Sequence, residues 1–104
     1  MAVAAMVALP ASEHPSRMPF LHCKLDVFQL AVEWVLQVQR VTVRLPREWW
    51  WMADQLRRAS GSIPLNTAEG SARPGTATER KYYNIARDSA AECDACVVIL
   101  HRAG

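Results

Sequence analysis

The sequence lacks any apolar run that could cross a membrane. Its longest uncharged stretch extends from Met1 to Ser12, whereas a membrane-spanning helix needs about 20 apolar residues. The stretch also lacks the basic segment with which a secretory signal peptide begins. We therefore expect a cytoplasmic protein with no membrane partner.

The residue sets that usually carry catalysis are also absent. The sequence has no glycine-rich phosphate loop, no run of metal ligands and no Ser/His/Asp set. No two carboxylates follow the pattern of a catalytic cleft. We therefore expect no enzymatic activity, no cofactor and no metal.

Cysteine is scarce, and its odd count argues against a disulfide framework. The chain has Cys23, Cys93 and Cys96, which without an export signal indicates free thiols in a reducing compartment. Cys93 and Cys96 fall late in a predicted helix, whereas a redox pair of this spacing lies at a helix N-terminus. Two core thiols are the favoured interpretation. A zinc site is the alternative, but its other ligands, His22 and Cys23, would lie about 25 Å away within one chain.

The composition is that of one globular domain. A chain of 104 residues has the size of a single domain, and with 51% hydrophobic and 21% charged residues it should fold. The net charge of +2 is too small and too diffuse to indicate nucleic-acid binding by itself.

Apolar residues recur at helical spacing in three segments. Residues 24–44 form the first, a second begins near Trp49–Trp51 and stops at Gly70, and a third follows the Thr76 capping box and runs to the end. On the first helix the apolar residues occupy two adjacent rows, which predicts a wide core face, with a subunit contact as the alternative. We expect an all-α, up-down antiparallel bundle over residues 24–104. Prolines make residues 1–23 a flexible leader.

The second helix carries a stretch that resembles a known family. The residues LPREWWWMADQLRRASGSIPLNTAEGSAR, followed by YYNIARDSAAEC, are similar to the four-helix-bundle family that includes the 23S rRNA intervening-sequence proteins. The resemblance covers residues 25–100. It implies a long second helix that passes through Pro64 with a kink. Local propensity instead favours a break at Gly61, with Ser62 capping a new helix.

The sequence departs from the family at two places. Thr67 stands where relatives usually have Ile or Val, so looser packing is expected there. The fourth helix of the family is missing after Gly104, which would leave an open groove among three helices. A partner chain that covers this groove, or a truncated member of the family, would explain the departure.

The family motif predicts a set of residues with structural roles, which are polar except for one proline and one glycine. Asn66 and Glu69 lie on a mostly apolar helix, where an unpaired buried polar group costs about 1 to 3 kcal/mol. We expect Glu69 or Glu92 to pair with Arg57 or Arg58, and Asn66 to bond the backbone freed by the proline. A ligand or RNA site is the alternative. The predicted structural set is Arg57, Arg58, Ser62, Pro64, Asn66, Glu69, Gly70 and Glu92.

Two further sets are candidates for intermolecular contact. Three consecutive tryptophans cannot all face one core, so at least one ring should be exposed. The predicted oligomer contacts are Trp34, Trp49, Trp50 and Trp51, and the resemblance implies a ring-like pentamer. A surface for stacking bases is the alternative. The predicted nucleic-acid contacts are Arg57, Arg58, Arg73, Arg80, Lys81 and Arg87, with a merely solvated surface as the alternative.

The expected function is a non-enzymatic, oligomeric binding or assembly module. The family is similar to the accessory variability determinant of diversity-generating retroelements, which implies affinity for RNA or DNA. A structural adaptor that holds a partner protein or helix in the open groove is the alternative.

Overall fold

A computed structural model describes residues 25–104, and this part of the chain is built of helices alone. Helix α2 spans Asp26–Thr42, the single 3-10 turn η4 spans Arg47–Trp49, α3 spans Trp50–Ser71 and α4 spans Ala77–Ala103. No strand occurs between residues 25 and 104. The all-α class predicted from the sequence is confirmed. The expected leader, residues 1–23, lies outside the described residues.

The first helix buries a narrower face than its sequence predicts. In α2 only Ala31, Val38 and Thr42 are buried. Leu30 and Val41, which belong to the second of the two predicted apolar rows, are 70% and 56% exposed. The expected wide core face is therefore wrong. Because α2 packs chiefly against α3, one facing helix covers only one stripe of it.

Helix α3 is continuous across its proline. Pro64 lies buried inside a helix of 22 residues that runs from Trp50 to Ser71, so the alternative with a break at Gly61 is wrong. Pro64 has no N–H to donate to the carbonyl of Ser60. A bend of the helix axis at this point stays a prediction.

Helix α3 ends at Ser71, one residue after the predicted stop, so Gly70 is its penultimate residue and not a left-handed cap. The residue with positive φ in the following turn is Gly75, at 76°. A Cβ on Gly70 would lie 2.6 Å from a ring carbon of Tyr83 and 3.1 Å from the carbonyl oxygen of Glu79. Gly70 therefore allows α3 and α4 to approach closely where they meet.

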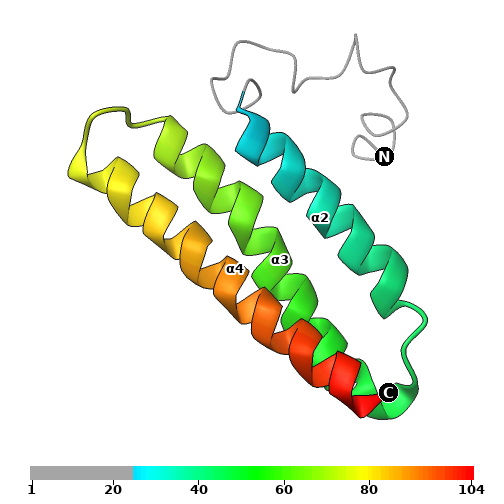
Figure 1. Ribbon diagram of the computed structural model, residues 1–104. Helices are drawn as coiled ribbons and strands as arrows, with labels where there is room; N and C mark the ends of the chain where they lie inside the picture. Colours follow the sequence, from blue (N-terminus) through cyan, green and yellow to red (C-terminus); the bar gives the residue numbers. More distant parts are fainter. Residues whose placement is uncertain (1–24) are drawn as a thin grey trace, which may run out of the picture.

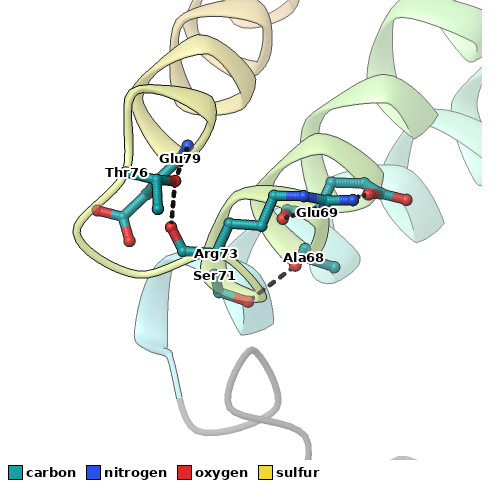
Figure 2. Close-up of polar contacts among 6 residues, drawn as sticks. All are labelled: Ala68, Glu69, Ser71, Arg73, Thr76 and Glu79. Carbon is teal, nitrogen blue, oxygen red and sulfur yellow. Dashed lines mark hydrogen bonds and ion pairs between the residues drawn. The ribbon is translucent and has the colours of Figure 1, made fainter.

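The start of α4 follows the predicted cap. The hydroxyl of Thr76 accepts a 3.1 Å hydrogen bond from the backbone N–H of Glu79 and donates at 2.6 Å to the carbonyl of Arg73 (Figure 2). Ser71 closes the end of α3 with a 2.9 Å bond from its hydroxyl to the Ala68 carbonyl. The bond from Glu79 satisfies a backbone N–H that the start of α4 leaves without a partner inside the helix.

Helix α3 lies between the other two helices and supplies half of the core cluster (Figure 1). Cross-helix contacts pair residue 55 with 92, 62 with 89 and 70 with 83, so numbers that rise along α3 fall along α4. The core cluster is Val38, Met52, Leu56, Ala59, Cys93 and Cys96. The complete up-down bundle, with its kink, stays a prediction.

Candidate functional site

An apolar groove runs between α2 and α4, with α3 as its floor. It consists of two adjoining pockets of about 300 and 320 Å³, which share Trp34 and Val97. The remaining lining residues are Gln37, Val38, Val41, Leu56, Ile63, Ala90, Cys93 and Asp94. The groove exists because α2 and α4 both pack on α3 and make few contacts with each other.

Large apolar side chains stand exposed on the two helices that flank this apolar groove. On α2, Val27 and Leu30 are 56% and 70% exposed and share the helix face of Trp34, and on α4 Val97 is 39% exposed. Contiguous apolar surface of this kind marks interaction sites more often than scattered single residues do. The groove and its flanks can therefore take up an apolar helix face.

The predicted oligomer contacts fall into two groups. Trp34 lines the apolar groove, and Trp49 packs against the core cluster. Trp50 and Trp51 lie at the corner between α2 and α3 and are 57% and 64% exposed. The expectation that at least one ring of the triplet is exposed is thus confirmed, and only Trp34 reaches the groove.

Asn66 belongs to a small polar network that links α3 with α4. Its side-chain amide donates 2.8 Å hydrogen bonds to the carbonyl and to the hydroxyl of Ser62. The Ser62 hydroxyl also accepts a 2.8 Å bond from the hydroxyl of Ser89 in α4. Asn66 bonds the carbonyl of Ser62 and not that of Ser60, which the proline frees, so the predicted partner was wrong by two residues. Ser89 was missing from the predicted set, although its place in the inner stripe of α4 was the available signal.

The predicted pairs between arginines and glutamates are wrong. Glu69 is exposed and pairs with Arg73 at 3.1 Å, since Arg57 lies twelve residues, or about 18 Å, further back on the same helix. Arg58 pairs with Asp54 at 3.2 Å. Arg58 reaches Glu92 only through Gln55, whose amide bonds the Glu92 carboxylate.

Arg57 connects α3 to α2 instead. Its Nε donates a 2.9 Å hydrogen bond to the hydroxyl of Thr42, which is fully buried and itself donates to the Val38 carbonyl at 2.7 Å. Thr67, where looser packing was expected, is buried and donates to the Ile63 carbonyl at 2.8 Å. Its hydroxyl is therefore satisfied within its own helix.

The structure separates the predicted nucleic-acid contacts into two groups, one in α3 and the other in the following turn and in α4. Arg57 and Arg58 lie about 24 Å along the helix from Arg73. Arg73 and Lys81 both lie over the ring of Tyr82, at 5.6 and 5.9 Å from its centre. The two other members, Arg80 and Arg87, follow on α4 and are exposed, and Arg87 lies 3.9 Å from Asp88.

The two cysteines of α4 are core residues, as predicted. Cys93 and Cys96 are 3% and 4% exposed, and the sulfur of Cys93 lies 3.5 Å from the hydroxyl of Ser60. Burial, followed by the nearby charge of Glu92 and then by Cys93, raises the pKa of the Cys96 thiol. A raised pKa makes the reactive thiolate of Cys96 harder to form, so Cys96 is poorly suited to redox chemistry.

Residues 25–104 contain no cluster of three or more side chains that could hold a metal ion. None of the three helices in this part of the chain is long and apolar enough to span a bilayer.

Comparison with known proteins places the chain in a family. Neither the curated proteins nor the solved structures contain a significant match. The sequence model of the family described as 23S rRNA-intervening sequence protein matches residues 23–104, which include α2, α3 and α4, the polar network and the apolar groove. The chain therefore belongs to the 23S rRNA-intervening sequence protein family.

Proposed function

We propose that this chain is a non-enzymatic assembly module of the cytoplasm that self-associates through its apolar groove and then binds RNA or DNA. The apolar groove carries the proposal, because Trp34, Val41 and Val97 expose apolar surface between two helices that leave α3 partly uncovered. Removing apolar surface from water contributes about 25 cal/mol per Å². Covering this groove is therefore a direct source of association energy.

A second copy of the chain is the occupant that we favour. Every copy carries both the apolar groove and the exposed apolar residues that flank it, so copies offer matching surfaces to each other. Family membership supports an up-down helical bundle with a bend of α3 at Pro64, and a ring of five copies is the assembly that the resemblance implies.

The basic residues beside the turn between α3 and α4 support nucleic-acid binding by the assembled form. Arg80 and Lys81 are exposed and make no ion pair with the described residues. One chain carries only a small excess of positive charge. In a closed assembly these cations repeat around an axis, and their fields add at the phosphate backbone.

The role of the apolar groove is tested by placing a charge in it. Val97→Asp introduces a carboxylate where both pockets meet, and Leu65→Asp is the matched control, because Leu65 is 69% exposed and lines neither pocket. We expect Val97→Asp to weaken self-association at least about tenfold, since an interface that buries an unpaired charge is strongly disfavoured. An unchanged molar mass for Val97→Asp, measured by light scattering, would show that self-association does not use the groove.

An adaptor that holds a partner helix is the second candidate. The apolar groove extends along two helices, which is the geometry that an amphipathic helix of another protein fits. The adaptor predicts a chain that stays monomeric and folded at high concentration, whereas the assembly module predicts a defined oligomer.

A further inference from the structure

The corner between α2 and α3 carries an exposed aromatic platform that the apolar groove does not include. The rings of Trp49 and Trp51 are stacked, with centroids 6.1 Å apart and planes at 27°, and Trp49 anchors the pair on the core. Trp50 is 57% exposed, and the guanidinium carbon of Arg47 lies 5.7 Å from the centre of its ring. Large rings are thus held open to solvent beside a cation.

A pocket of about 460 Å³ adjoins this platform. It is lined by Thr42, Val43, Trp50, Asp54 and Arg57. The bond from Arg57 Nε to the Thr42 hydroxyl, at 2.9 Å, fixes the guanidinium in the pocket wall. Among residues 25–104 Arg57 has no ion pair, whereas Asp54 is paired with Arg58 at 3.2 Å. Arg57 is therefore the unpaired charge of this pocket.

Positive charge is concentrated at this corner. Residues 40–58 contain five arginines and two carboxylates, an excess of three. The whole chain has a net charge of +2, so its other residues together carry −1. By contrast, in the turn between α3 and α4 the guanidinium of Arg73 is already paired with Glu69 at 3.1 Å. The α2–α3 corner is thus the more cationic of the two ends.

We propose that the α2–α3 corner binds single-stranded nucleic acid, with a base stacked on Trp50 and a phosphate at Arg57. Exposed indole rings give sequence-tolerant stacking surfaces for unpaired bases, and a fixed guanidinium recognises phosphate through directed hydrogen bonds. The bases of a duplex are stacked on each other and offer no free face to Trp50. The site rests on the proposed nucleic-acid function and adds a base-stacking contact to the phosphate contacts proposed for Arg80 and Lys81.

Binding of a fluorescein-labelled oligoadenylate RNA to the full chain tests this site. The probe is about 12 nucleotides long, within the range of single-strand sites. We expect Trp50→Ala to weaken binding about ten- to hundredfold in fluorescence anisotropy, because it removes one stacking partner. The matched control is Leu65→Ala, which changes a 69% exposed residue of the same helix and should leave affinity unchanged.

Three charge variants test the phosphate contact independently of base stacking. Arg57→Gln should weaken binding and reduce the slope of log K against log salt by about 0.7, the value for one phosphate contact of a single strand. Arg47→Gln, which breaks no hydrogen bond between described residues, serves as a second variant if Arg57→Gln melts early. Asp54→Asn should strengthen binding, since it removes a carboxylate from the pocket wall.

The outcomes separate this site from the proposed function. Normal binding by Trp50→Ala, together with its loss when Arg80 and Lys81 become alanine, would overturn the corner site and leave the proposed function standing. A drop in molar mass of Trp50→Ala without a change in affinity would make the corner a subunit contact and overturn the site. No binding of the probe by the unaltered chain would overturn both proposals.

Discussion

The hydroxyl of Ser89 in α4 donates a 2.8 Å hydrogen bond to the hydroxyl of Ser62 in α3, which also accepts one from Asn66. This bond ties the two helices together two residues before Pro64. Because a hydrogen bond is directional, it helps to fix how α3 and α4 align along their axes, in addition to the apolar contacts of the core.

Removing Ser62 should therefore cost more than the loss of one surface hydroxyl. We expect Ser62→Ala to lower the free energy of unfolding by about 1 to 3 kcal/mol, because it leaves the amide of Asn66 and the hydroxyl of Ser89 short of a partner. A double-mutant cycle with Ser89→Ala, followed by urea unfolding, measures the coupling, for which we expect about 0.5 to 1.5 kcal/mol. Fully additive effects would show that the bond does not connect the helices.

Two glycines of α3 should respond in opposite directions to alanine. A Cβ on Gly61 would meet no atom within 4 Å, whereas one on Gly70 would lie 2.6 Å from the ring of Tyr83. Gly61→Ala should stabilise the protein by about 0.5 to 1 kcal/mol through helix propensity. Gly70→Ala should destabilise it by about 1 to 3 kcal/mol through crowding. Thermal melting of both variants checks the pair, and the same sign for both would contradict the close approach.

The surface ion pair of Glu69 should contribute little. Because Glu69 and Arg73 are about half exposed, we expect Glu69→Ala to change the free energy of unfolding by less than about 1 kcal/mol. Thr76→Ala, which removes the cap of α4, should cost about 0.5 to 2 kcal/mol in the same urea titration. A larger effect for Glu69→Ala than for Thr76→Ala would restore the structural role that the sequence suggested for Glu69.

The raised pKa of Cys96 predicts a loss of stability at alkaline pH. A thiol whose pKa is higher in the folded than in the unfolded protein stabilises the fold below its unfolded pKa. That contribution disappears as the pH rises through the folded value. The free energy of unfolding should therefore fall as the pH rises above 9.0, the ordinary value for the thiol. Cys96→Ala should show a shallower fall in the same titration, and an identical slope would mean that Cys96 does not contribute.

Local sequence chemistry was enough to predict the three helices. The predictions of individual residue roles failed where contacts between helices decide the outcome. The Thr76 cap could be predicted because its partner lies three residues away. Gly70 looked like a helix stop, and only the position of Tyr83 explains why glycine is needed inside α3. The partners of Arg57 and Glu69 were mispredicted because helix rise keeps them about 18 Å apart. An open groove among the three helices was predicted from the missing fourth helix. The residues that line it could not be predicted, because they depend on how α2 and α4 pack on α3.

The most direct measurement is the molar mass of the unaltered chain by light scattering behind a sizing column, at low and at high salt, with thermal melting of the same sample. Association through an apolar groove does not weaken with salt. We expect one discrete oligomer that persists at high salt and melts cooperatively. A cooperatively melting monomer at every concentration would contradict self-association, and an aggregating, non-cooperative chain would contradict a stable assembly module.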